Sequence, residues 1–471
     1  MLEYFLSDQI YHFYQETDMQ NKEFLGTEPI GKLLFKMAIP TVLAQLVNML
    51  YNIVDRIFIG HIPEVGDTAL TGVGICMPII LAVSAFAALI SAGGAPRTSI
   101  LMGEGKYSEA EKILGNCFTL QAIISVILTF LIFIFNRNLL WIFGASENTI
   151  EYATSYMNIY AIGTIFVQLT LGMNAYITAQ GATKTSMISV LIGAIANIVL
   201  DPIFIFAFDM GVAGAALATI ISQALSCTWA LHFLFSDRSI IKIRKNNINI
   251  SLKTVLPCIA LGLAPFIMQI SESVISVCFN SSLQKYGGDI AVGAMTILTS
   301  VMQFAMLPLQ GVAQGAQPIT SFNYGAKNKD RVKQSFFLLL KVSLTYSITL
   351  WACIMLFPEL FAGIFTNNPE LIQFTQTALR IYCGALAIFG IQIATQMTFI
   401  SLGKAFSSII VAIVRKFVLL LPLIYIVPLL IENKTMGVYL AEPIADTLAV
   451  TFTAILFLLQ FRKALKMMDN Q

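Results

Sequence analysis

The stretch Gly93-Gly-Ala-Pro-Arg-Thr-Ser99 recurs 222 residues later as Gly315-Ala-Gln-Pro-Ile-Thr-Ser321. In both copies the first glycine, the proline and the Thr-Ser pair keep the same spacing. A constant offset that extends over about 120 positions indicates an internal repeat, so we expect two related halves. The same shift aligns further identical residues: Gly66 with Gly288, Ala69 with Ala291, Gly103 with Gly325, Phe143 with Phe365, Ile159-Tyr160 with Ile381-Tyr382, Gly181 with Gly403 and Ser186 with Ser408, while nearer the start an offset of 225 pairs Pro40 with Pro265.

The overall composition places this repeat in a membrane. Of 471 residues, 57% are hydrophobic and only 11% are charged, and the mean hydropathy is +0.78. A soluble globular protein carries roughly 25% charged residues, so the composition excludes a soluble enzyme and a disordered scaffold. The 28 basic and 26 acidic residues give a net charge of +2, which offers no surface for nucleic acid or another polyanion. The chain is a polytopic protein whose surroundings are the lipid bilayer.

Apolar stretches long enough to cross the hydrocarbon core, which takes about 20 helical residues, occur twelve times in the chain. Their approximate limits are 33–60, 67–92, 115–136, 157–180, 186–208, 212–235, 254–280, 289–313, 335–358, 379–402, 408–430 and 437–461. We therefore predict an all-α fold with twelve transmembrane helices in two six-helix lobes. The predicted organisation is an N-terminal tail at 1–32, an N-lobe at 33–236, a linker at 237–253, a C-lobe at 254–461 and a C-terminal tail at 462–471.

Basic residues are distributed unequally between the loops on the two sides of the predicted membrane. The termini and the even-numbered loops contain about twenty Lys and Arg, whereas the odd-numbered loops hold only Arg137, Lys285, Arg380 and Lys434. The positive-inside rule then places both termini in the cytoplasm of a cell-membrane protein. Each half has six spans, so the two copies share one orientation and are related by an axis along the membrane normal. Two such bundles around a central cleft suit alternating access.

Polar residues within the spans of the first half fall on common helix faces. Polar groups in hydrocarbon are costly and point inward or toward water. Asp55 and Asp201 could therefore hold a proton or a hard cation such as Na⁺, or could act only as structural hydrogen-bonding groups; we favour the ion site. Pro202 adds a carbonyl oxygen ligand, because it leaves the carbonyl of Ile198 without its helical donor. The stripes are Asn48, Tyr51, Asn52 and Asp55; Ser189, Gly193, Asn197 and Asp201; Thr219, Ser222 and Gln223; and Asn174 with Thr178.

The acid pair is not duplicated in the second half, where Asn280 stands at the position of Asp55 and Leu421 lies near that of Asp201. Glu272 is therefore expected to be the only strong acidic candidate deep in the C-lobe, either as a contact for a cationic substrate or as a helix–helix hydrogen bond. Arg415-Lys416 interrupts the eleventh span. Either the two side chains snorkel to the membrane interface, or they have a role in the cavity. Glutamines among Met and Phe predict an adaptable cavity for bulky, partly apolar ligands; these are Gln303, Gln310, Gln392 and Gln396.

Signatures of catalysis and of nucleotide binding are missing from the sequence. The seven cysteines are scattered singly, with no C-x-x-C, and none of the three histidines has a metal-ligand partner at helical spacing. There is no G-x-x-x-x-G-K-[ST] motif, so ATP is not the expected source of energy. We predict no catalytic residue, no metal centre and no organic cofactor.

Several strings resemble those of the multidrug and toxic compound extrusion (MATE) family from about residue 25 to residue 463. The resemblance implies twelve helices in two lobes and export of organic cations in exchange for H⁺ or Na⁺. It further implies that Asp55, Asn197, Asp201 and Thr219 form the N-lobe cation or proton site, that Tyr156 and Asn174 line its cavity, and that Pro40 is a hinge. Arg56 departs from the small polar residue usual after the first acid. The strings are Glu28–Pro40, Tyr51–Gly60, Asn197–Pro202, Gly211–Ala216 and Pro443–Asp446.

The resulting hypothesis is a secondary active multidrug exporter, expected to be monomeric, that exchanges cationic or amphipathic compounds for H⁺ or Na⁺. The alternative is a lipid-linked oligosaccharide flippase of related two-lobe architecture. Such a flippase would need a cavity rich in Arg and Lys for a pyrophosphate group, and the spans offer only the Arg415-Lys416 pair. A membrane-embedded enzyme would need a metal or nucleophile constellation, which the sequence does not contain.

Overall fold

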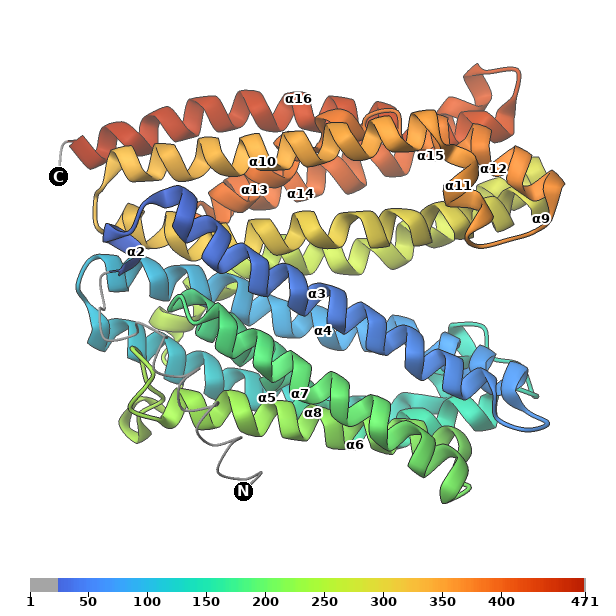
Figure 1. Cartoon of the computed structure of the whole chain (residues 1–471), viewed down its shortest axis with the longest axis horizontal. Helices are drawn as coiled ribbons and strands as arrows, with labels where there is room; N and C mark the ends of the chain where they lie inside the picture. Colours follow the sequence, from blue (N-terminus) through green and yellow to red (C-terminus); the bar gives the residue numbers. More distant parts are fainter. Residues whose placement is uncertain (1–23, 470–471) are drawn as a thin grey trace, which may run out of the picture.

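The computed structural model describes residues 24–469, and every regular element in that part of the chain is a helix (Figure 1). Most of the predicted N-terminal tail, residues 1–23, lies outside the described residues. The N-lobe begins with the short helix α2 (Phe24–Thr27). It continues through α3 (Ile30–Gly60), α4 (Gly66–Gly103), α5 (Tyr107–Ile142), α6 (Ile150–Ala179), α7 (Thr183–Pro202), the π-helix η1 (Ile203–Ala207) and α8 (Gly211–Phe235).

A linker that contains the short 3₁₀ helix η2 (Lys245–Asn247) leads to the C-lobe. The predicted C-terminal tail at 462–471 starts inside a helix, because the last helix continues to Asp469. The C-lobe comprises α9 (Leu252–Gly325), α10 (Lys329–Leu356), α11 (Pro358–Gly363), α12 (Pro369–Tyr382), α13 (Leu386–Ser401), α14 (Ala405–Ile413), the π-helix η3 (Val414–Leu420), α15 (Leu421–Leu430) and α16 (Lys434–Asp469).

The number of membrane spans agrees with the hydropathy pattern. Within residues 24–469, ten helices are long and apolar enough to cross a membrane, and the bent pair α12–α13 provides an eleventh span. The 74-residue helix α9 contains two spans, because its backbone leaves the helical region at Gly288 (φ 64°, ψ −159°). Counted in this way, the described residues form twelve spans, and the all-α polytopic fold is confirmed.

Gly288 also explains why the repeat offset changes from 225 to 222 residues. In the N-lobe the first two spans are joined by a loop between Gly60 and Gly66, whereas in the C-lobe the corresponding spans turn directly at Gly288. The second copy is therefore three residues shorter at this turn. The backbone conformation of Gly288 is one that essentially only glycine adopts. This explains why a glycine stands at the tightest point of the shortened connection.

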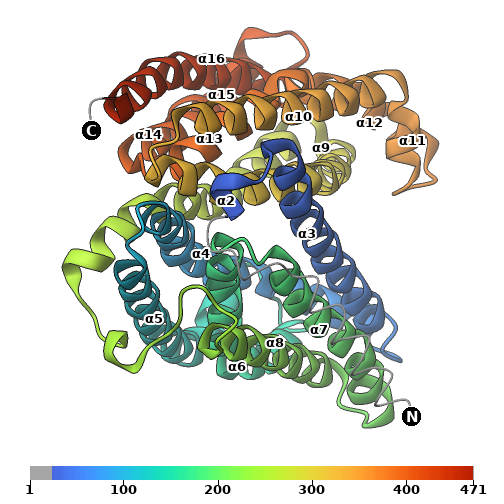
Figure 2. The same ribbon diagram turned by 60° about the vertical axis from the view of Figure 1, so that its left-hand side comes forward.

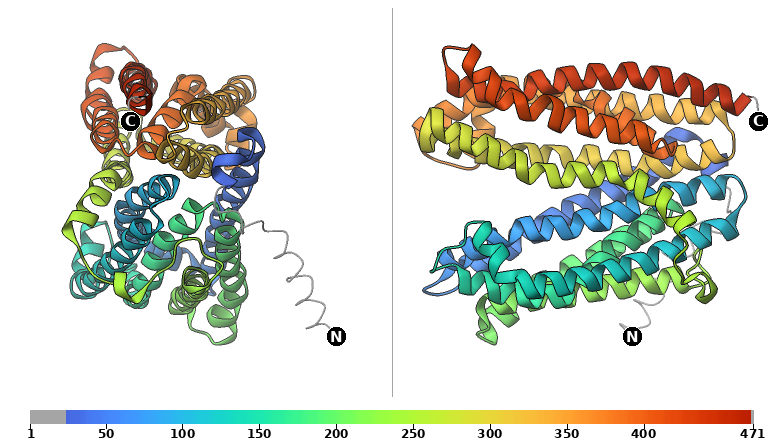
Figure 3. Two further views of the ribbon diagram at one scale, coloured as in Figure 1. Left: turned by 90° about the vertical axis from the view of Figure 1, so that its left-hand side faces the viewer. Right: turned by 180° about the vertical axis from the view of Figure 1, so that it is seen from behind.

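The two lobes are packed together at one end of the molecule and diverge toward the other (Figure 3). We call the packed end, which carries α2, the linker and the C-terminal end of α16, the closed end, and the opposite end the open end. A Cβ added to Gly103 on α4 would lie 2.0 Å from the carbonyl oxygen of Phe322 on α9, and one added to Gly325 would lie 1.9 Å from that of Ile100. The offset of 222 residues relates Gly103 to Gly325 and Ile100 to Phe322. The repeat thus makes the same backbone contact twice, where only glycine fits.

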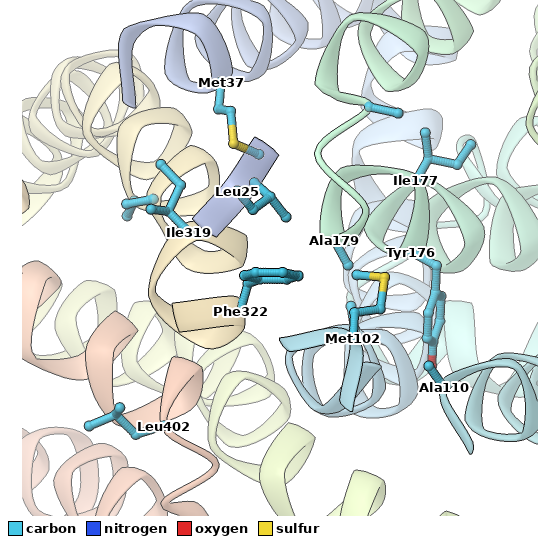
Figure 4. Packing of buried hydrophobic residues seen from close by; sticks show 14 of the residues in the cluster. Leu25, Met37, Met102, Ala110, Tyr176, Ile177, Ala179, Ile319, Phe322 and Leu402 are labelled. Atoms are coloured by element: carbon cyan, nitrogen blue, oxygen red, sulfur yellow. The ribbon is translucent and has the colours of Figure 1, made fainter. Parts of the chain in front are cut away.

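Helix α2 lies between the lobes at the closed end. Arg331 of α10 donates hydrogen bonds to the carbonyl oxygens of Leu25 (3.1 Å) and Glu28 (2.7 Å). The ring of Phe24 occupies the position beside Gly181, at the end of α6, where a Cβ would lie 2.2 Å from it. Figure 4 shows Leu25 between Met37 of α3 and Phe322 of α9. One short segment therefore contacts both lobes.

The linker lies against the N-lobe (Figure 2). The side-chain oxygen of Gln180, at the end of α6, accepts hydrogen bonds from the hydroxyl of Ser239 (3.0 Å) and from the backbone N–H of Ile241 (3.2 Å). Arg244 forms an ion pair with Glu111 of α5. These contacts fix the linker to the N-lobe at the closed end.

Candidate functional site

A small cavity lies inside the N-lobe, between α3, α6, α7 and α8. Its volume is about 50 Å³, and a single water needs roughly 10–15 Å³ of such space, so the cavity has room for a few waters or a small cation. The polar stripes predicted from helical periodicity meet here. The lining residues are Asn48, Tyr51, Thr170, Leu171, Asn174, Val190, Gly193, Ala194, Asn197, Thr219, Ser222, Gln223 and Ser226.

Asp55 and Asp201 lie one helical turn beyond the cavity-lining residues Tyr51 and Asn197, toward the open end. Asp55 is 8% exposed and Asp201 is fully buried. The carboxyl groups of the two residues are near enough to act on each other directly. A proton or a cation between them would relieve their repulsion, because two unshielded negative charges repel strongly in a low dielectric. The structure thus brings together two acids that are far apart in the sequence.

The local backbone positions Asp201 for this contact. Its carboxylate accepts a 3.0 Å hydrogen bond from the amide of Asn197, one helical turn earlier. Pro202, which cannot donate a backbone hydrogen bond, follows directly, and the helix continues as the π-helix η1. π-Helical segments often occur at functional sites, because they widen the helix and change the direction of its side chains.

Several polar atoms around the cavity make no hydrogen bond within the described residues. Buried polar groups are rarely left without a partner in native proteins. Their concentration around one cavity indicates a site for polar occupants. The unpartnered atoms are Asp55 Oδ1, Asn174 Oδ1, Asn197 Oδ1, Asp201 Oδ2, Ser222 Oγ and Gln223 Oε1, all of them potential ligands for a proton donor, water or hard cation.

Two tyrosines complete the wall around the acids. Tyr51 lies close to Gln223, and Tyr156 lies close to Thr219. Tyr156 is 4% exposed and belongs to the apolar core of the N-lobe. The predicted residues Tyr51, Tyr156 and Thr219 therefore lie at one site, although Tyr156 packs mainly against apolar residues.

Pro40 and Arg56 lie toward opposite ends of α3. Pro40 is buried at the interface between the lobes, and the hydroxyl of its neighbour Thr41 donates a 2.7 Å hydrogen bond to the carbonyl of Gly311 on α9. Arg56 is exposed, and its guanidinium contacts the sulfur of Met77 on α4 at 3.3 Å. Its guanidinium is therefore exposed and held against α4, although its charge still acts on the buried carboxyl group of Asp55 beside it.

A sequence profile of the MatE family matches residues 40–203 and 265–426, one segment in each lobe. The chain belongs to the MATE family. The two matched segments begin at Pro40 and Pro265, the prolines that the repeat pairs. The family resemblance and the two-lobe repeat predicted from the sequence are thereby confirmed.

Known relatives of this MATE protein are distant in sequence but match over nearly the whole chain. It is 22% identical over 440 residues to the multidrug export protein MepA of Staphylococcus aureus (strain NCTC 8325 / PS 47), covering 93% of this chain and 96% of MepA. Its fold is similar to a crystal structure of a MATE protein in the bent conformation, with a TM-score of 0.89, 23% identity and coverage of 95% and 99% of the two chains. An outward-facing MATE family transporter gives a TM-score of 0.87 at 23% identity, with coverage of 94% and 98%.

The C-lobe of the MATE protein contains a buried ion-pair network that was not predicted from the sequence. Arg415 Nε lies 2.8 Å from a carboxylate oxygen of Asp446, and its Nη2 lies 3.6 Å from Glu442. Its guanidinium also stacks over the ring of Phe389, 4.7 Å from the centroid. The guanidinium of Arg415 is therefore directed into the C-lobe, not toward the lipid headgroups.

The other members of this network are Lys416 and Glu272. The ammonium of Lys416 lies 2.7 Å from a carboxylate oxygen of Glu272 on α9. The expectation that Glu272 is the only acid deep in the C-lobe is wrong, because Glu442 and Asp446 lie in the last span and face the two cations. The available signal was charge matching: two cations in one apolar span and two acids four residues apart in the next.

The predicted glutamines occupy two different environments in the MATE protein. Gln303 and Gln310 are exposed along the second half of α9. Gln392 and Gln396 of α13 are only 1% and 7% exposed. They contact each other at 3.4 Å, and the amide of Gln396 also contacts the sulfur of Met268.

Proposed function

We propose that this MATE protein is a secondary active multidrug exporter that exchanges cationic or amphipathic organic compounds for H⁺ or Na⁺. The observation that carries the proposal is the pair of buried acids, Asp55 and Asp201, which lies one helical turn from the polar N-lobe cavity and its unpartnered polar atoms. Ionisable residues inside a membrane bundle usually mark ion or substrate pathways, because burying them is costly. The likeness to MepA, a multidrug export protein, supports the substrate class.

Coupling would follow from competition between the ion and the drug for negative charge. A proton or Na⁺ that binds between Asp55 and Asp201 removes the charge that attracts a cationic drug. Only such a difference in affinity between two states can drive exchange. The bond between Thr41 and Gly311 and the buried Pro40 place α3 where its bending would change the contact between the lobes.

The positive-inside pattern makes the closed end the cytoplasmic one, so the described conformation would open to the outside. Both termini would then be cytoplasmic. A single chain supplies both lobes of the pathway, which is consistent with a functional monomer. The flippase alternative is less favoured, because Arg415 and Lys416 are paired with carboxylates and do not present free positive charge to a pyrophosphate.

The decisive experiment is ethidium efflux from proteoliposomes with an imposed pH gradient or Na⁺ gradient, each applied alone. We expect one gradient to drive efflux and Asp201→Asn to abolish the response to that gradient. Asp67→Asn, an exposed acid at the start of α4, is the matched control and should behave as wild type. Full gradient-driven efflux in Asp201→Asn would contradict the proposal.

A further inference from the structure

The ion pair between Lys416 and Glu272 is unusual in the exposure of its two partners. The Lys416 side chain is 4% exposed, whereas that of Glu272 is 58% exposed. A carboxylate in a membrane span faces the bundle interior or water rather than lipid. Phe266 on the same helix contacts Phe86 of α4, the facing lobe, with ring centroids 5.1 Å apart. Glu272 lies six residues beyond it, roughly 9 Å toward the open end, so its exposed side chain lies past the point where this helix contacts the facing lobe.

The network around this pair contains more acids than bases. Three carboxylates, on Glu272, Glu442 and Asp446, face two cations, on Arg415 and Lys416. With every group ionised the network lacks one positive charge. Buried charges are stable only when they are paired, so a proton on one carboxylate or one additional monovalent cation would balance the network.

Glu442 is the carboxylate that lacks a close partner. Its distance of 3.6 Å to Arg415 is longer than the 2.8 Å of Asp446 and the 2.7 Å of Glu272 to their partners. Glu442 is also near enough to Lys416 for direct electrostatic interaction. A lysine ammonium is a point charge on a flexible stem. The ammonium of Lys416 therefore has a second acceptor within the network if it leaves Glu272.

We propose that Lys416 determines cation selectivity by acting as a resident counter-ion that an entering organic cation displaces from Glu272. The displaced ammonium moves to Glu442, and the network becomes fully paired: Arg415 with Asp446, Lys416 with Glu442, and the substrate with Glu272. Neutral compounds gain nothing from this exchange. This inference rests on the proposed function as an exporter of organic cations and adds the residue that selects them.

Binding of tetraphenylphosphonium to the purified full-length protein, measured by calorimetry without any gradient, tests the proposal. Lys416→Gln removes the competitor, so we expect the Kd to fall by about tenfold. Glu272→Gln should raise the Kd by about tenfold, and Lys416→Gln added to Glu272→Gln should have no further effect. Triphenylphosphine oxide, a neutral compound of similar shape, should bind all variants equally.

Lys416→Arg provides a second test that keeps the charge. A guanidinium holds a carboxylate with two hydrogen bonds, so this variant should bind tetraphenylphosphonium more weakly than wild type. Unchanged or weaker binding in a folded Lys416→Gln protein would overturn the proposal. If Lys416→Gln does not fold, as judged by gel filtration, unchanged or tighter binding in Lys416→Arg would overturn it. These measurements do not depend on the coupling ion, so failure of gradient-driven efflux leaves their outcome intact.

Discussion

Asp201 in the N-lobe and Arg415 in the C-lobe both lie in the fifth span of their lobe, next to or inside a π-helical segment. In the N-lobe this position carries an acid that faces a second acid, Asp55, across unpartnered polar atoms. In the C-lobe the corresponding span carries a base, Arg415, about two helical turns nearer the closed end than the counterpart of Asp201, and two acids neutralise it, Glu442 and Asp446. Two related bundles thus place buried charge of opposite sign in corresponding spans. Under the proposed function the N-lobe receives its cation from outside, whereas the C-lobe already contains two.

The strongest test of this contrast is neutralisation of the N-lobe acid. Asp201→Asn should lower gradient-driven ethidium efflux by about 100-fold, the upper range of coupling between two ligands. The melting temperature should remain near that of wild type, because the acid has no basic partner to lose. Loss of stability in parallel with loss of transport would indicate that the N-lobe pair is structural.

In the C-lobe we expect loss of a buried charge to lower the stability of the protein. Arg415→Met should lower the free energy of unfolding by about 3–5 kcal/mol, because it leaves two buried carboxylates without their cation. Thermal unfolding of the purified protein, followed by tryptophan fluorescence, measures the change. A loss of less than about 1 kcal/mol, the value typical of exposed ion pairs, would show that the network is open to water.

Removing one base and one acid together should restore most of that stability. Arg415→Met combined with Asp446→Leu replaces an ion pair by apolar side chains, which is often neutral or stabilising in a buried site. We expect the double variant to unfold within about 1–2 kcal/mol of wild type. A double variant as unstable as Arg415→Met alone would mean that Glu442 is the acid that requires the base.

The smallest effect is expected at Arg56, the base that follows Asp55 in the sequence. Its exposed guanidinium contacts Met77, so Arg56→Gln should change the stability by less than about 0.5 kcal/mol. Efflux at saturating dye should stay within about threefold of wild type, because surface charges are screened. A large loss of efflux would place the Arg56 charge in the ion pathway and weaken the contrast between the lobes.

Most of the N-lobe site could be predicted because helical periodicity is a local property. Residues three and four apart share a face, and a polar face in an apolar span points inward. Tyr51, Asp55, Asn197, Asp201, Thr219 and Gln223 were recognised on this basis, and the structure brings them together. The cavity between them depends on how four helices pack, which no single stripe reports.

The C-lobe network could not be predicted in the same way. From the sequence, Arg415-Lys416 is as compatible with snorkelling as with a role in the cavity. The position of a base within a span does not identify the acid with which it pairs. Asp446 and Glu442 become partners of Arg415 only when α16 packs against η3. Charge balance between neighbouring spans was the available signal, and it is a long-range property of the fold.

The repeat, the number of spans and the helix faces that carry polar residues could all be predicted, since each follows from spacing along the chain. Which of these groups meet depends on tertiary packing. This packing placed Asp55 opposite Asp201, joined Lys416 to an exposed Glu272, and brought Gly103 and Gly325 into backbone contact. The physical reason is that the spacing of residues along the chain sets the helix face on which each side chain lies. The pairing of side chains between helices depends on packing and charge across the whole bundle.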